Sequence, residues 1–97
     1  MGVYLSFSGT KEELVESYKD NLSADIIERI LKLPEIIIKD NIEYKIQIYI
    51  QFFSIGNMFY NTHIDYVGEH KFLFEPKSFL YIRESLEYAE ENIKAYL

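Results

Sequence analysis

A strict alternation of apolar and polar residues between positions 42 and 52 constrains the fold of this chain more than any other feature. The even positions carry Ile, Tyr or Phe, and the odd positions carry Glu, Lys, Gln and a single Tyr. Because successive side chains of a strand point to opposite faces of a sheet, this pattern predicts a long antiparallel strand buried on one face only. The sheet that contains it should therefore have one covered and one uncovered face.

The next alternating run, residues 58–66, must pair with this strand in a register that keeps its polar residues out of the core. A three-residue loop at 55–57 sets Ile48 opposite Ile64 and leaves Asp65 on the outer face, whereas a two-residue loop buries the carboxylate. A slip of one residue reverses every side chain, and burying even a neutral polar group without a partner costs roughly 2–7 kcal/mol. We therefore predict the three-residue loop. The same argument at residues 68–70 predicts another strand that pairs Tyr66 with Phe72 and Ile64 with Phe74.

Helices are expected before and after this β region. Thr10, Ser23 and Ser78 are suitable N-cap residues, and each precedes apolar residues at spacings of three and four. The segment 35–39 is either an edge strand or an extension of the exit of the second helix, and Asp40-Asn41 suits a tight turn. The predicted order is β-α-α-β-β-β-β-α, with strands near 3–7, 35–39, 42–52, 58–66 and 71–75 and helices at 10–21, 23–33 and 79–96.

These elements predict one α+β domain spanning 1–97, with a mostly antiparallel sheet of four to five strands, helices packed on one face and a long C-terminal helix. The second helix should turn Ile26, Ile27, Ile30, Leu31 and Leu33 inward, and the last helix Phe79, Ile82, Leu86, Ala89, Ile93 and Tyr96. Periodicity also assigns a set of aromatic residues to the core: Phe7, Tyr18, Tyr44, Phe52, Tyr60, Tyr66, Phe72, Phe74 and Phe79.

Composition excludes several function classes. The net charge of −6 argues against a nucleic-acid clamp, which needs a basic face. No apolar run approaches the ~20 residues of a membrane span. The chain has no Cys, which removes disulfide, thiol and iron–sulfur chemistry, and it contains no motif for a cofactor. We expect a cytoplasmic protein without a cofactor, from a source whose genome is rich in AT codons.

The predicted register gathers a mixed aromatic and polar surface on the outer face. It places a histidine, a phenol and a carboxylate, His63, Tyr49 and Glu75, in one cross-strand row. Nine Tyr and seven Phe exceed what one small core needs, so some aromatic residues should face outward, joined by Ile36 and Ile38. A surface of this composition is typical of the centre of an interface. The expected partner-binding residues are Gln47, Tyr49, Gln51, Phe53, Phe59, Asn61, His63, Asp65, Leu73 and Glu75.

Two chemical interpretations of this surface are weaker than binding. His63 could act as a general acid or base oriented by Glu75 or Asp65, or the three could hold a metal ion. No recognisable catalytic motif accompanies them, and an open sheet face lacks walls that exclude water. We therefore expect no catalytic and no metal-binding residues.

Three functions remain for testing. The first is a small acidic protein-binding module, an inhibitor of the immunity, antitoxin or anti-defence type, whose acidity would speed encounter with a basic partner such as a nuclease or another nucleic-acid-binding protein. The second is a homodimeric accessory or structural protein, since twofold dimers are the commonest oligomers. The third is a minor enzyme or metal binder centred on His63. None of these involves direct contact with nucleic acid or a membrane.

Overall fold

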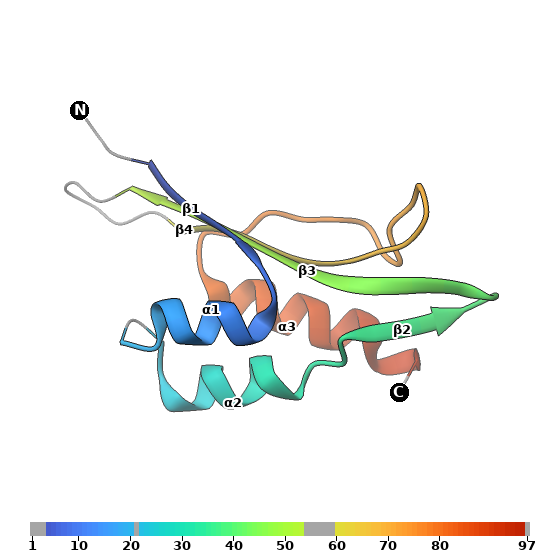
Figure 1. The fold of residues 1–97 in the computed structure, drawn as a ribbon, viewed down its shortest axis with the longest axis horizontal. Coiled ribbons are helices and arrows are strands. Elements are labelled where there is room, and N and C mark those ends of the chain that lie inside the picture. The colour runs from blue at the N-terminus through green and yellow to red at the C-terminus, as the bar shows by residue number, and fades with distance from the viewer. Residues whose placement is uncertain (1–3, 21, 54–59, 97) are drawn as a thin grey trace.

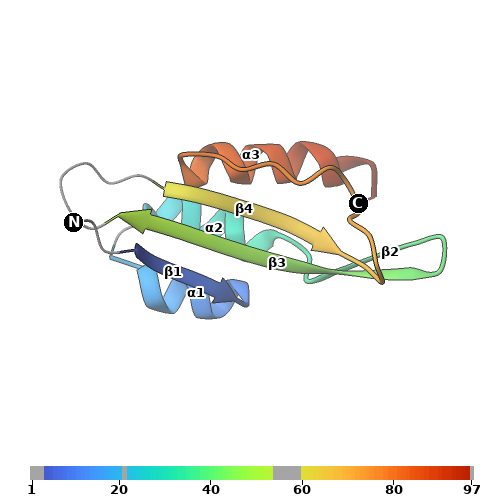
Figure 2. The ribbon, with the colours of Figure 1, turned by 90° about the horizontal axis from the view of Figure 1, so that it is seen from above.

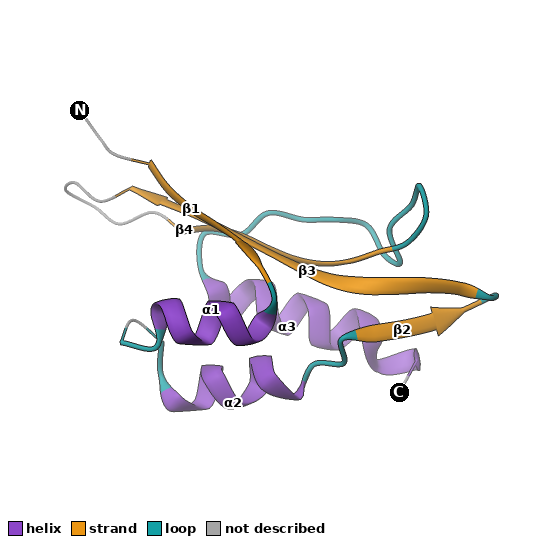
Figure 3. Cartoon of the chain, viewed as in Figure 1, coloured by secondary structure: helices purple, strands orange, loops and turns teal. Residues whose placement is uncertain are grey.

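In the part of the chain that the structure describes, three helices cover one face of an antiparallel sheet and no helix lies on the other face (Figures 1 and 3). The computed structural model describes residues 4–20, 22–53 and 60–96, and their side chains over 9–20, 22–50 and 61–96. The elements in chain order are β1 (Tyr4–Gly9), α1 (Lys11–Tyr18), α2 (Ala24–Lys32), β2 (Ile36–Lys39), β3 (Ile42–Phe53), β4 (Tyr60–Val67) and α3 (Ile82–Ile93), followed by a 3₁₀ turn, Lys94–Tyr96.

Strand β3 pairs with each of the other strands. Lys45 lies opposite Ile36 of β2 and Val67 of β4, so β2 and β4 occupy opposite edges of β3. Ile48 lies opposite Gly9 of β1 as well as a residue of β4, which places β1 on the same edge as β2. Strands β1 and β2 therefore follow one another along one edge of β3, and β4 takes the other edge. Figure 2 shows β1 and β4 on opposite sides of β3.

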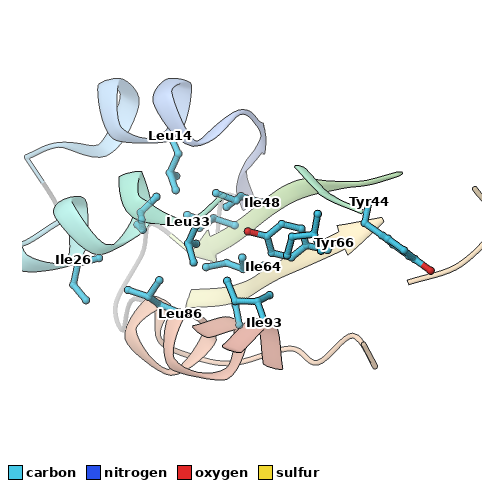
Figure 4. Close-up of a cluster of buried hydrophobic side chains, with 13 residues drawn as sticks. Leu14, Ile26, Leu33, Tyr44, Ile48, Ile64, Tyr66, Leu86 and Ile93 are labelled. Atoms are coloured by element: carbon cyan, nitrogen blue, oxygen red, sulfur yellow. The ribbon is translucent and has the colours of Figure 1, made fainter. Parts of the chain in front are cut away.

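The alternation of β3 and β4 places their even-numbered residues toward the helices. Tyr44, Ile48 and Tyr66 are almost completely buried there, and the hydroxyl of Tyr66 donates to the carbonyl of Pro34 at 2.6 Å. Figure 4 shows Ile48 and Tyr66 beside residues of the helices, with Tyr44 farther along the sheet. The buried hydrophobic residues are Leu14, Ile26, Ile30, Leu33, Ile37, Tyr44, Ile48, Ile50, Ile64, Tyr66, Leu86, Ala89 and Ile93.

Local signals in the sequence form as expected at three places. Thr10 and Ser23 cap α1 and α2, since their hydroxyls accept the backbone N–H groups of residues three positions later. Asp40 and Asn41 have φ values of 52° and 66°, the left-handed conformation of a two-residue hairpin turn. The segment Ile36–Lys39 is an edge strand.

The predicted register of the central hairpin is confirmed. Ile48 pairs with Ile64, and Phe52 with Tyr60. The loop proposed at 55–57 lies outside the described residues, as do the side chains of Phe7, Phe52 and Tyr60. The α+β class, the antiparallel sheet and the C-terminal helix are also confirmed, but the predicted order of elements is not.

The strand predicted at 71–75 is absent. After β4 the backbone N–H of Gly68 donates to the carbonyl of Lys71, and Val67 bridges to Phe72. This register is one residue away from the predicted pairing of Tyr66 with Phe72. A Cβ on Gly68 would lie only 2.8 Å from the ring of Tyr44, so the turn is packed directly against this buried ring.

The one-residue difference exchanges the positions of Phe72 and Leu73 relative to the prediction. Phe72, predicted in the core, is 46% exposed, whereas Leu73, predicted on the outer face, is half-buried against the core. Phe74 also packs against the core, as predicted.

Helix α3 begins at Ile82 and not after Ser78. The buried Thr62 of β4 forms hydrogen bonds with the chain here. Its backbone N–H and C=O pair with Phe79, and its hydroxyl lies 3.3 Å from the carbonyl of Tyr81. Ser78 donates to the side chain of Asn61 instead of capping a helix. A buried hydroxyl needs a partner, and residues 79–81 supply it in an extended conformation.

Three smaller predictions about the helices are wrong. Leu31 of α2 is 42% exposed because the buried stripe of this helix runs through Ile26, Ile30 and Leu33. Tyr96 is exposed beyond the end of α3, and α1 ends at Tyr18 instead of residue 21.

Lys11 is a buried charge that the sequence pattern did not indicate. Its ammonium donates to the carbonyls of Leu31 and Leu33, where α2 ends and its last carbonyls have no partner within the helix. Lys11 thereby ties the start of α1 to the end of α2.

Replacing Lys11 tests whether its hydrogen bonds to the end of α2 stabilise the fold. Lys11→Met should lower the free energy of unfolding by about 2 kcal/mol, because it leaves buried carbonyls without a donor. Lys19→Met removes an exposed lysine that lies 3.4 Å from Glu16, and it should change the value by less than about 0.5 kcal/mol. Urea unfolding followed by circular dichroism gives both numbers. Equal stability of the two variants would contradict the role of Lys11.

Candidate interaction surface on the outer face of the sheet

The outer face carries the odd-numbered residues of β3 and β4, as the alternation predicts. Two cross-strand rows are described in full: Gln47 opposite Asp65, and Tyr49 opposite His63. Gln47 is exposed, and the other three are half-buried. The next row pairs Gln51 with Asn61.

The side chains of Gln51, Phe53 and Phe59 lie outside the described residues. Their predicted role stays a prediction.

Tyr49 and His63 form the aromatic contact of this face. Their ring centroids are 6.0 Å apart and the planes make an angle of 63°, an edge-to-face arrangement. Because both side chains are only half-buried, a partner would cover apolar ring surface and still find a hydroxyl and imidazole nitrogens to bond. This pair is suited to recognition, since Tyr and other amphipathic aromatic residues are enriched at interface centres.

Asp65 is the electrostatically unfavourable residue of the face. Its Oδ1 is buried and makes no hydrogen bond to the described part of the chain. Burial raises the pKa of the Asp65 carboxyl, and the nearby His63 acts in the opposite direction. A buried carboxylate oxygen without a hydrogen bond is stabilised by any partner that supplies a hydrogen-bond donor.

The predicted neighbour Glu75 does not join His63. The segment after Phe72 leaves the sheet register, and the hydroxyl of Tyr88 on α3 donates to the carbonyl of Glu75 at 2.6 Å. The rings of Phe74 and Phe79 lie 5.6 and 5.3 Å from that of Tyr88, so aromatic packing on α3 holds this segment outside the sheet. The row of Tyr49, His63 and Glu75 is therefore incomplete, and Leu73 is also absent from the outer face.

No metal centre forms from His63, Asp65 and Glu75. Over residues 4–20, 22–53 and 60–96, no three His, Asp or Glu side chains come together in a way that could hold an ion. The interpretation that these three residues could hold a metal ion assumed that they lie together, and the structure does not bring them together.

A second part of the outer face was predicted only in part: Ile36 was expected there, but Phe72 was not. One row of paired residues crosses β2, β3, β4 and the segment that follows. It consists of Ile36, Lys45, Val67 and Phe72, each of which pairs with the next. Ile36 is 45% exposed and Phe72 46%. The outward position of Ile36 was predictable from alternation, but that of Phe72 depends on the turn at Gly68.

Asp65→Asn should stabilise the protein near neutral pH. The folded-state pKa of Asp65 lies above its ordinary value of 3.8, so the ionised form lowers stability, and this penalty disappears as the pH falls through the raised pKa. We expect a gain of about 1 kcal/mol at pH 7, or roughly 4–8 °C in Tm, that shrinks toward zero near about pH 3. Thermal unfolding across this pH range measures it.

Asp20→Asn is the matched control, because Asp20 is exposed beyond the end of α1. It should leave the Tm almost unchanged. A loss of stability in Asp65→Asn at pH 7 would show that the carboxylate has a favourable partner.

Comparisons with known proteins add no assignment: no protein-family model, no curated protein sequence and no solved structure matches the chain significantly. Within the described ranges, every helix is too short or too polar to cross a lipid bilayer.

Proposed function

We propose that this chain is a small acidic protein-binding module of the inhibitor type, acting as immunity proteins, antitoxins and anti-defence proteins do, in the cytoplasm. The observation that carries the proposal is the contrast between the two faces of the sheet. The inner face is filled by the helices, whereas the outer face holds half-buried Tyr49 and His63 beside polar residues, with no helix over it in the described structure.

Charge supports a basic partner. The chain has a net charge of −6, and the exposed face of α3 adds Glu84, Glu87 and Glu91 to the acidic surface. An acidic surface raises the rate at which a basic protein is encountered and repels acidic competitors. A nuclease or another nucleic-acid-binding protein has the complementary charge.

A homodimer is the second candidate, and the exposed apolar residues favour it. Ile38 is 70% exposed and Ile36 is 45% exposed on the edge strand β2. An edge strand with apolar side chains is a template for pairing with another chain. Sedimentation at micromolar concentration separates the candidates, because a monomer excludes the dimer and a twofold mass supports it.

Tyr49→Glu tests the proposed face. We expect affinity capture from a lysate of a low-GC bacterium to retain a discrete partner on the wild-type chain and to lose it on the variant, since a carboxylate replaces the apolar ring at the centre of the face. Tyr81→Glu is the matched control, because Tyr81 is 59% exposed at the start of α3, away from the outer face. Retention of the partner by Tyr49→Glu, in a chain whose circular dichroism is unchanged, would refute the assignment of this face.

A further inference from the structure

A hollow of about 620 Å³ lies where β1 ends and β2 begins along the same edge of β3. Figure 1 shows the β1–α1 turn and the start of β2 next to each other on one side of β3. Beside it the backbone N–H of Ile46 donates to the carbonyl of Glu35 at 3.0 Å. At ~30 Å³ per water molecule it has the volume of roughly 20 waters, which is room for an extended side chain.

The hollow is continuous with the row across the outer face. Ile36, Lys45 and Val67 belong to both, and Phe72 extends the row beyond the hollow. The ammonium of Lys45 lies 4.0 Å from a carboxylate oxygen of Glu43, two residues away on the same strand. We call the hollow and the adjoining row together the edge groove.

The carboxylates at the hollow determine which partner fits. Glu12, Glu13 and Glu35 all line it and are exposed. Glu13 accepts a hydrogen bond from Thr10, but Glu12 and Glu35 form no ion pair within the described part of the chain.

The cations beside the hollow do not neutralise these carboxylates. The ammonium of Lys11, although it lines the hollow, is used by the carbonyls of Leu31 and Leu33. That of Lys45 lies beside Glu43. The hollow therefore presents carboxylates whose complement is a cation from outside.

We propose that the edge groove is the docking site of a basic, partly apolar segment of a protein partner. A Lys or Arg side chain of that segment enters the hollow between Glu12 and Glu35, and its apolar side chains lie across Ile36, Val67 and Phe72. This inference rests on the proposed function and specifies the chemistry of the partner. A second copy of this acidic chain is the less suitable occupant, since its net charge of −6 repels the carboxylates.

The probe is a capped hexapeptide of alternating Leu and Arg, titrated into the ¹⁵N-labelled full chain. We expect saturable amide shifts concentrated at residues 36, 45–47, 67 and 72. A hexapeptide of alternating Leu and Glu should cause no such shifts, and one of alternating Ser and Arg should bind about tenfold more weakly because it lacks apolar side chains. Shifts spread over α3, equal binding of all three peptides or no binding at all would overturn the proposal.

Charge variants separate a specific site from general attraction. Glu12→Gln combined with Glu35→Gln should weaken binding of the Leu-Arg peptide about tenfold or more, because both removed carboxylates line the hollow. Glu87→Gln combined with Glu91→Gln changes the net charge equally on the exposed face of α3 and should leave affinity within about twofold. Equal losses in the two double variants would overturn the proposal.

Failure of this inference can be told apart from failure of the proposed function. Loss of a captured partner with Tyr49→Glu, together with full affinity in the Glu12→Gln, Glu35→Gln variant, would retain the proposed function and refute the edge groove. Amide shifts in the groove that depend only on protein concentration would also refute it, because the occupant would then be a second copy.

Discussion

The pairing of β3 with all three other strands is the constraint on which the rest of this structure depends. Both of its edges are occupied, β1 and β2 following each other along one and β4 along the other. Its inner face must be covered because Tyr44, Ile48 and Ile50 are there, and the three helices provide that cover. Its outer face needs no cover, since it carries side chains that tolerate water.

The segment between β4 and α3 follows contacts that lie far from it in sequence. The ring of Tyr44 sets the turn at Gly68, Tyr88 holds the carbonyl of Glu75, and the buried hydroxyl of Thr62 captures residues 79–81. The contacts of Tyr44 and Thr62 fill space in the core or satisfy a buried group, that of Tyr88 adds an exposed hydrogen bond, and together they outweigh the alternation that favours another strand. For this reason the row of Tyr49 and His63 ends at β4. Only the row that contains Val67 continues beyond β4, to Phe72.

The proposed binding function would use both parts of the outer face. The central rows offer the half-buried rings of Tyr49 and His63 and the unpaired oxygen of Asp65, and the edge groove offers apolar side chains beside carboxylates. Interfaces commonly combine a few aromatic anchors with charges that select the partner. A basic protein with an apolar surface segment would meet both requirements.

By itself the sequence determined the features that depend on residues close together along the chain and on the alternation of apolar and polar residues in the strands. These are the register of β3 and β4, the N-caps at Thr10 and Ser23, the turn at Asp40-Asn41, and the outward position of Tyr49, His63 and Asp65. Tertiary structure decided the position of Phe72, the loss of Glu75 from the predicted row, the role of Lys11 and the hollow between β1 and β2. The physical reason is the same in each case: these features depend on groups supplied by distant parts of the chain, and no local pattern records which distant group will be the neighbour.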